Sequence, residues 1–355
     1  MKIIVTHNSP DLDAIASVWL IKRFLPGWNE AEVKFVSAGE RLNKSGSLPH
    51  VVNDARRVSV LESKADPSSL NESRSPKSNS NLDKKAGSAF SSFTSGQTSS
   101  LETTIEQING NKVIHVDTGL GALDHHLTED EETSAASLTF DFIKKMLEKE
   151  HQVMGEEKKE AIERMVKIIV DTDHFKEVYW DNPTADYHEF SFLGILEGLK
   201  LEKPDNDINY IDFGMECLDA VLHNFENRIW AEKEIHDAGI RFNTKWGKGI
   251  GFETINDSVL KLSQKMGYVV AVRRDPRKGY IRIKARPTSG IRSKESGIRE
   301  IDLTPVYDKL KEMDSSATWF LHVSKKMLLN GTAKNPKMKP TNLSLNDIIR
   351  VLETI

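Results

Sequence analysis

The sequence IIVTHNSPDLDA, residues 3–14, joins a short apolar run to a segment with apolar residues at helical spacing. The run Ile3-Ile4-Val5 is typical of a buried strand, and residues 14–24 are typical of a helix. The turn between them contains three potential metal ligands: His7, Asp11 and Asp13. Because sites in open parallel sheets form at the carboxyl ends of strands, this turn predicts a metal site. The alternative is that an aspartate caps the helix, for which one residue is enough.

The composition indicates a soluble protein with more than one core. The chain has 355 residues, of which 38% are apolar, so two domains are the better expectation. A net charge of −4 argues against a protein that coats nucleic acid with its whole surface, although a local basic patch could still bind it. The single cysteine, Cys217, excludes an internal disulfide framework and a four-cysteine zinc site.

Membrane and secretory segments are not expected either. No apolar run approaches the roughly 20 residues that a membrane helix needs. The N-terminal residues enter a strand directly and do not resemble a secretory signal. We therefore expect a cytoplasmic protein with no membrane partner.

The first part of the chain predicts a mostly parallel sheet, because strand, polar turn and helix patterns follow one another repeatedly. We assign residues 1–200 to this N-terminal domain, with strands expected at 32–36, 58–61 and 112–116 after the first. Residues 63–110 are rich in Ser, Asn and Lys, a composition that cannot bury enough apolar surface to offset its ordering entropy. We expect this stretch to be a disordered insertion inside the domain.

The second part predicts a helical linker, 201–245, and a smaller α+β C-terminal domain, 246–355. The fold class is therefore α/β with a second, α+β domain. The expected C-terminal elements are a long helix at 213–240, a strand at 249–255, a helix at 258–265, a hairpin of 268–272 with 280–285, a helix at 306–313, a strand at 318–323 and a closing helix at 344–352 capped by Ser344.

More acidic and imidazole residues follow later elements of the N-terminal domain. Asp117 follows the strand at 112–116, Asp124-His125-His126 comes seven residues later, and Asp171-Thr172-Asp173 ends a predicted helix. Each motif alone is weak evidence, because histidine pairs and helix-terminal aspartates are common. Their occurrence at the ends of consecutive elements favours one binuclear metal site.

The ligand types indicate the metal and its chemistry. Carboxylate and imidazole suit Mn²⁺, and also Mg²⁺, iron or zinc. Two such ions roughly 3.5–4 Å apart clamp a water and stabilise the oxygens that enter and leave in a phosphate displacement. This chemistry needs a bridging carboxylate, and Asp117 at a strand end is well placed to supply it.

The ordered motifs resemble those of the DHH phosphoesterase superfamily: His7-x-x-x-Asp11-x-Asp13-Ala14, Val116-Asp117-Thr118, Asp124-His125-His126 and Asp171-x-Asp173. This resemblance implies a DHH-type N-terminal domain and two divalent metal ions, Mn²⁺ foremost and Mg²⁺ second. It implies that His126 meets the substrate phosphate and that Asp117 bridges the two ions. The first metal would be held by His7, Asp11 and Asp117, and the second by Asp13, Asp117, His125 and one of Asp171 or Asp173.

Within the superfamily, the chain is most similar to the melanocyte-proliferating-gene (MYG-type) exonucleases. The similarity lies in the Ser134-Ala135-Ala136 helix start and in the C-terminal order of residues 301–305, a helix, residues 320–324 and a closing helix. It implies a 3′–5′ exonuclease or oligonucleotide phosphodiesterase that acts on RNA or short oligonucleotides.

A basic window supports a polyanionic substrate. Arg282, Lys284 and Arg286 alternate along one strand of the predicted hairpin and so share a face. A solvated hairpin face would explain them, but beside a phosphoesterase site they would bind a nucleic-acid backbone. The alternatives are an inorganic pyrophosphatase or small-nucleotide phosphatase, and a non-catalytic nucleotide-binding module. The sequence leaves the oligomeric state open, with a homodimer as one option.

Overall fold

The computed structural model describes residues 1–42, 101–287, 300–332 and 335–355. These residues form a mixed α/β fold with two mixed sheets. One compact unit contains residues 1–146 and 197–211, and the other contains 147–196 and 212–355. The predicted domain ranges 1–200, 201–245 and 246–355 divide the chain differently and stay predictions. The strand expected at 58–61 lies outside the described residues.

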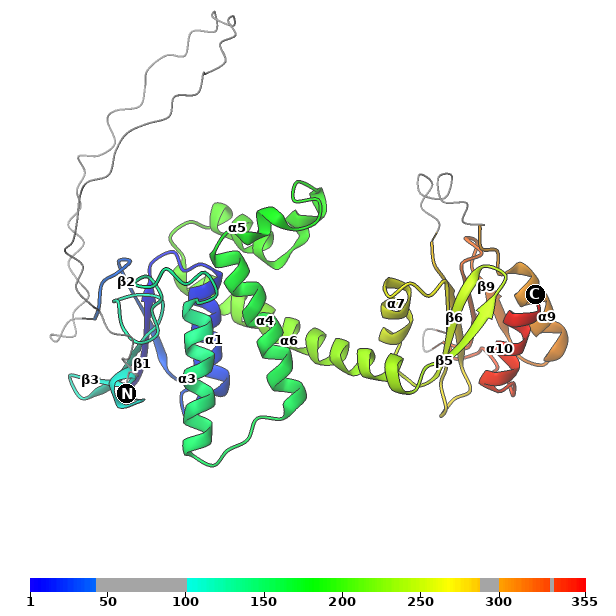
Figure 1. Cartoon of the computed structure of the whole chain (residues 1–355), viewed down its shortest axis with the longest axis horizontal. Coiled ribbons are helices and arrows are strands. Elements are labelled where there is room, and N and C mark those ends of the chain that lie inside the picture. Colours follow the sequence, from blue (N-terminus) through cyan, green and yellow to red (C-terminus); the bar gives the residue numbers. More distant parts are fainter. Residues whose placement is uncertain (43–100, 288–299, 333–334) are drawn as a thin grey trace, which may run out of the picture. The chain divides into compact units, whose positions relative to one another are not determined.

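The first unit is built on a sheet with the strand order β2-β1-β4-β3 (Figure 1). β1 pairs in parallel with both β2 and β4, which places Ile4 opposite Val33 and Ile114 and confirms the expected parallel pairing. One face of this sheet buries Ile3, Val5 and Val113 together with neighbouring apolar side chains. From the N-terminus, the described elements are β1 (Lys2–His7), α1 (Leu12–Phe24), β2 (Glu32–Val36), α2 (Leu101–Thr104), β3 (Glu106–Ile108), β4 (Asn111–His115) and α3 (Ala135–Lys149).

α1 is a helix that is buried along most of its length. Asp11 is its N-cap, and the Asp11 carboxylate accepts a hydrogen bond of 3.0 Å from the backbone N–H of Ala14. Every residue from Leu12 to Ile21 is buried, so the helix is surrounded by protein instead of having one solvated face. The predicted alternative, that an aspartate caps this helix, is therefore confirmed for Asp11.

The prediction of a disordered insertion over 63–110 is wrong for its last part, where α2 and β3 form. β3 pairs with β4 in antiparallel, with Ile108 opposite Asn111. The two residues between them, Asn109 and Gly110, have φ angles of 51° and 77°, as a type I′ hairpin turn requires. An Asn-Gly pair is a strong hairpin signal, so the sequence did indicate this turn. Ile108, directly before the turn, is buried in the structure.

The second unit contains a sheet with the strand order β5-β6-β7-β8-β10-β9. Its neighbouring strands are antiparallel except for the parallel pair β6 and β7. The chain continues from α3 through α4 (Glu156–Asp173), η1 (Lys176–Tyr179), η2 (Asp186–Phe190), α5 (Phe192–Glu202), α6 (Asp207–Asp237), β5 (Ile240–Thr244), β6 (Gly247–Glu253), α7 (Ser258–Lys265), β7 (Val270–Arg274), β8 (Ile281–Ala285), α9 (Thr304–Met313), β9 (Trp319–Leu321), β10 (Met327–Asn330) and α10 (Leu345–Thr354), where η1 and η2 are short 3₁₀ helices.

Helices cover the two faces of this second sheet to different extents (Figure 1). On one face, Val270, Val272 and Ile283 pack against the apolar sides of α9 and α10. On the other face, Ile250 and Phe252 pack against α7 and the last turns of α6. This second face also carries the charged side chains of β8, because strand side chains alternate between faces.

Several predicted C-terminal elements are confirmed. α7 has the expected bounds, and β7 and β8 form the expected hairpin with Val270 opposite Ala285. Ser344 caps α10: its hydroxyl accepts from the backbone N–H of Asp347, and the Asp347 carboxylate accepts from the N–H of Ser344. This reciprocal pair is a capping box.

The long helix of the linker ends earlier than predicted. α6 stops at Asp237, and Ile240, which was expected in the helix, begins strand β5. β5 pairs with β6 across the two-residue turn Lys245-Trp246. Helical spacing of apolar residues continued past Asp237 in the sequence, but strand pairing with β6 takes precedence there. None of the described helices is long and apolar enough to cross a membrane.

Asp314 connects the end of α9 to the segment that precedes α10. Its carboxylate accepts hydrogen bonds from the hydroxyls of Thr341 and Ser316, both at 2.7 Å. The backbone N–H groups of Ala317 and Asn342 also donate to it, both at 3.2 Å. The bonds from Thr341 and Ser316 lower the pKa of Asp314 to about 2.

We expect Asp314→Asn to lower the melting temperature at pH 7 by a few degrees. In the unfolded chain an aspartate has a pKa of about 4, so the ionised Asp314 stabilises the fold above that pH. The stabilisation declines as the pH falls from about 5 towards 2, so the difference in melting temperature between variant and wild type should narrow over that range and vanish near pH 2. Asp308→Asn, at an exposed position of α9, is the matched control. A difference that does not change with pH would contradict this role.

Candidate metal centre

His7 and Asp117 meet at one edge of the first sheet. His7 ends β1, and Asp117 follows the neighbouring parallel strand β4, so both leave the sheet at the carboxyl end. His7 Nε2 lies 3.1 Å from Asp117 Oδ2 and 4.0 Å from Asp11 Oδ2. The other ring nitrogen, Nδ1, lies 2.8 Å from the carbonyl oxygen of Asn8, which orients the ring.

The surroundings of His7 favour a positive charge. Burial lowers the pKa of His7, but the hydrogen bonds to Asp117 and to the Asn8 carbonyl, with the charges of Asp11 and Asp117, raise it to about 9. Carboxylates on one side of the ring thus hold a proton there in the absence of a cation. A divalent ion placed between His7, Asp11 and Asp117 would replace that proton as the neutralising charge.

Asp117 is held in an unusual backbone conformation. Its φ of 52° lies in the left-handed region, which few residues other than glycine adopt. The backbone N–H of Asp117 donates to the carbonyl of Leu123 at 3.0 Å, which closes the loop that leads to Asp124-His125-His126. The side chain is 2% exposed, and its Oδ1 accepts no hydrogen bond from any described residue. Because such a buried oxygen is costly without a partner, it fits a bound cation.

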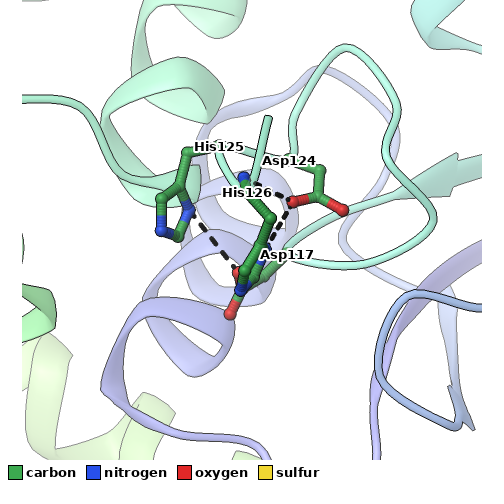
Figure 2. A group of neighbouring side chains, drawn as sticks. All are labelled: Asp117, Asp124, His125 and His126. Atoms are coloured by element: carbon green, nitrogen blue, oxygen red, sulfur yellow. Dashed lines mark hydrogen bonds and ion pairs between the residues drawn. The ribbon is translucent and has the colours of Figure 1, made fainter. Parts of the chain in front are cut away.

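Asp124, His125 and His126 approach Asp117 from the following loop (Figure 2). The nearest nitrogens of His125 and His126, Nδ1 in each ring, lie 3.7 and 3.8 Å from Asp117 Oδ1. The two imidazoles stack with their centroids 4.6 Å apart. Asp124 Oδ1 lies 2.6 Å from Nδ1 of His126, and the side chain of His126 is 57% exposed. Asp124 therefore orients His126 while the far edge of the ring faces solvent.

The charge state of Asp124 agrees with that role. Burial raises its pKa, but hydrogen bonds from the His126 side chain and from the backbone N–H groups of His126 and Leu120 outweigh the burial and lower it. Asp124 is thus an acceptor, so His126 Nδ1 carries the proton between them. The other ring nitrogen, Nε2, is directed away from Asp124 and can meet a ligand.

Asp13 has a structural task that the sequence did not indicate. It is buried, and both of its carboxylate oxygens accept hydrogen bonds from the start of α3. The Ser134 hydroxyl donates at 2.7 Å, Ala135 N–H at 2.7 Å and Ala136 N–H at 2.8 Å. Asp13 Oδ2 also lies 3.7 Å from Nδ1 of His125. The small residues at this helix start leave room for this close approach of Asp13.

Among the described residues of the first unit, two groups of potential ligands result, and Asp117 belongs to both. One contains His7, Asp11 and Asp117, and the other contains Asp117, Asp124, His125 and His126; in each, the potential ligand atoms lie within 4.8 Å of one another. Carboxylate and imidazole at this spacing fit a divalent cation such as Mn²⁺ or Mg²⁺. Asp124 was not among the predicted ligands, although its place in the Asp-His-His motif was a signal.

Asp171 and Asp173 lie in the last turn of α4, in the second unit. Asp171 pairs with Lys167 at 3.7 Å, and Asp173 Oδ2 is 3.8 Å from Nε2 of His174. The prediction that one of these two aspartates completes the second metal site stays a prediction.

Lys200 and Asp207 hold the turn between β1 and α1 at Ser9, and neither was predicted. The backbone of Ser9 is left-handed, with a φ of 52°. Its N–H donates to Asp207 Oδ1 at 3.0 Å, and its carbonyl accepts from Lys200 Nζ at 3.2 Å. Burial lowers the pKa of Lys200, against the opposing charges of Asp11 and Asp207. About 190 residues separate the partners, so no local sequence pattern could have indicated this clamp.

The predicted substrate-binding cations lie in the second unit. The expected alternation is confirmed: the side chains of Arg282 and Lys284 are partly buried between the fully buried Ile281, Ile283 and Ala285. Arg282 forms an ion pair with Asp257. Arg286 follows β8, and its backbone N–H donates to the Val269 carbonyl at 2.8 Å. Contact of these three residues with a substrate stays a prediction.

We expect Asp13→Ala to lower the free energy of unfolding by about 2–4 kcal/mol in metal-free protein, because it leaves three donors at the start of α3 without an acceptor. His125→Ala removes no such acceptor and should cost about 1 kcal/mol or less. Urea unfolding in the presence of a chelator measures both. Equal losses in the two variants would show that Asp13 has no structural task of its own.

The two ligand groups are thus defined by the geometry of this chain. No protein-family model matches the sequence, and no curated protein gives a significant match to it. Membership of the DHH superfamily and of its MYG-type branch therefore stays a proposal.

Proposed function

We propose that this chain is a metal-dependent phosphodiester hydrolase of DHH type. The observation that supports it most is the position of Asp117, whose Oδ2 faces His7 and whose Oδ1 faces His125 and His126. Hydrolysis with two metal ions requires a carboxylate shared between them. A helix cap or an isolated histidine pair would not require two ligand groups that share one buried aspartate.

The residues divide into metal ligands and a substrate contact. His7, Asp11 and Asp117 would hold one ion, and Asp13, Asp117, His125 and one of the α4 aspartates would hold the other. When bound, two divalent ions, Mn²⁺ foremost, supply a nucleophile derived from water and neutralise charge on the phosphate. Asp124 holds Nδ1 of His126, so that His126, when both ring nitrogens carry a proton, can donate from Nε2 to a phosphate oxygen.

The substrate that we propose is RNA or a short oligonucleotide, cleaved from the 3′ end. Its support is the cationic face of β8, which pyrophosphate would not need, and the resemblance of the motifs to MYG-type exonucleases. Of the two imidazoles, only that of His126 is substantially exposed. The exposed fraction of the side chain is 57% for His126 and 12% for His125. One exposed imidazole suits a reaction at a single phosphate.

Incubation of the full chain with Mn²⁺ and end-labelled RNA, a dinucleotide or pyrophosphate tests the proposal. We expect stepwise shortening of the RNA and cleavage of the dinucleotide. Turnover of pyrophosphate alone would replace the proposal with a pyrophosphatase. Bound metal without any turnover would favour a nucleotide-binding module.

Asp117→Asn should reduce hydrolysis by at least about a hundredfold, because it removes the charge that two ions would share. Asparagine tolerates the left-handed backbone, so the fold is expected to persist. Rates are compared at saturating Mn²⁺, and bound metal is measured after dialysis. Asp141→Asn is the control: Asp141 is an exposed residue of α3 that pairs with Lys144. Full activity of Asp117→Asn would refute the assigned centre.

Asp207→Ala is expected to weaken Mn²⁺ binding by about 10- to 100-fold through loss of the hydrogen bond to Ser9, with little change in melting temperature. Asp207→Asn keeps an oxygen acceptor and should retain most of the affinity. Glu202→Gln, at an exposed position of α5, serves as the control. Titration calorimetry measures the affinities, and equal values for all three variants would remove Asp207 from the site.

A further inference from the structure

A pocket of about 600 Å³ lies in the second unit, at the turn between β6 and α7. Trp230 of α6 and Ile255 form its apolar walls, and Asn256 and Asp257 supply polar groups. Trp230 is partly buried against the core that includes Phe252, whereas Ile255 is 52% exposed. The pocket thus combines one aromatic wall, one aliphatic wall and a polar edge.

The polar side chains of the pocket, Asn256 and Asp257, are held by hydrogen bonds and ion pairs. Asp257 Oδ1 lies 2.7 Å from Nε of Arg273, and Oδ2 forms an ion pair with Arg282. The amide of Asn256 accepts from Ser258 N–H at 2.9 Å and donates to Asn227 Oδ1 at 2.6 Å. Side chains whose rotamers are locked in this way bind a ligand without losing further conformational entropy.

Cations surround the carboxylate of Asp257. Arg273 is buried, and its guanidinium also donates to the Thr254 carbonyl at 3.0 Å. Lys284 lies on the same face of β8 as Arg282, and Lys261 follows Asp257 by one turn of α7. Burial first, and then the charges of Arg282 and Lys261, lower the pKa of Lys284. The excess of positive charge disfavours a cationic ligand and favours an anionic one.

We infer that this pocket binds a nucleotide, with its base stacked on Trp230 and its phosphate beside Lys284 and Lys261. A flat ring between an aromatic and an aliphatic wall is a common arrangement for a base, and stacking accepts any base. Asp257 accepts N–H groups from the edge of the base, because both its oxygens keep a lone pair beside their arginine contacts. The role of the pocket in turnover rests on the hydrolase proposed above, but nucleotide binding itself does not.

Guanosine monophosphate is the probe of choice, because guanine offers two adjacent N–H donors to a carboxylate. The full chain is titrated calorimetrically in a chelating buffer, so that the candidate metal centre does not contribute. We expect guanosine monophosphate to bind more tightly than guanosine, and ribose 5-phosphate not to bind detectably. Ribose 5-phosphate that binds as tightly as the nucleotide would overturn the stacking on Trp230.

Variants separate the base contact from the phosphate contact. Trp230→Ala should weaken binding of the nucleotide roughly tenfold or more, whereas Trp230→Phe retains most of it. Lys284→Gln should weaken binding of the nucleotide but not of guanosine. Trp246→Ala, which removes a partly buried tryptophan elsewhere in the unit, is the control, with melting temperatures measured for all variants. Unchanged affinity in a folded Trp230→Ala protein would refute the inference.

The two proposals can fail separately. Nucleotide binding that depends on Trp230 in a protein without hydrolytic activity would support the pocket and reject the hydrolase. RNA hydrolysis by a protein that does not bind the mononucleotide would reject the pocket and support the hydrolase.

Discussion

The first unit is arranged around the buried carboxylate of Asp117, which lies beside His7 on one side and beside His125 and His126 on the other. Asp117 has a left-handed backbone, with a φ of 52°, and an Oδ1 that accepts no hydrogen bond from any described residue. A strained backbone of this kind costs on the order of 1–3 kcal/mol, and the buried oxygen adds to it. The parallel strands hold the position: Val116 N–H donates to the Val5 carbonyl at 2.9 Å immediately before Asp117. A cation between the facing ligands would offset both costs.

The aspartates of the first turn combine structural roles with the ligand roles proposed for them. Asp11 uses Oδ1 to cap α1, while its Oδ2 faces His7. Asp13 caps the start of α3 with both oxygens and still lies 3.7 Å from His125. The two roles are compatible, because a carboxylate has about four lone-pair sites. The helix-cap and metal-ligand interpretations of this turn are therefore not exclusive, and loss of either aspartate would affect more than the metal.

In the second unit, the burial of Arg273 explains the ion pairs around it. A guanidinium that is 6% exposed needs compensating partners: the Thr254 carbonyl accepts its hydrogen bond, and Asp257 and Asp275 form ion pairs with it. Arg282 shares Asp257, so this cation of β8 is partly neutralised and held in place. The ion pair distinguishes Arg282 from a residue on a solvated hairpin face, where a long side chain would remain mobile.

Local sequence patterns predicted most of the helices and strands and many of the candidate metal ligands. Strand and helix patterns predicted β1, α1, the β7–β8 hairpin and α7, and the capping chemistry of Ser344 was visible, because these features depend on neighbours a few residues apart. The hairpin at Asn109-Gly110 was equally local. The contacts of Asp207 and Lys200 with Ser9, and of Asp13 with Ala135, join residues more than 100 positions apart, so only the folding of the first unit could establish them. The sequence therefore named the candidate ligands, with Asp117 as the shared carboxylate, and the folded chain showed which side chains lie on each side of Asp117, because only strand pairing and loop packing set those distances.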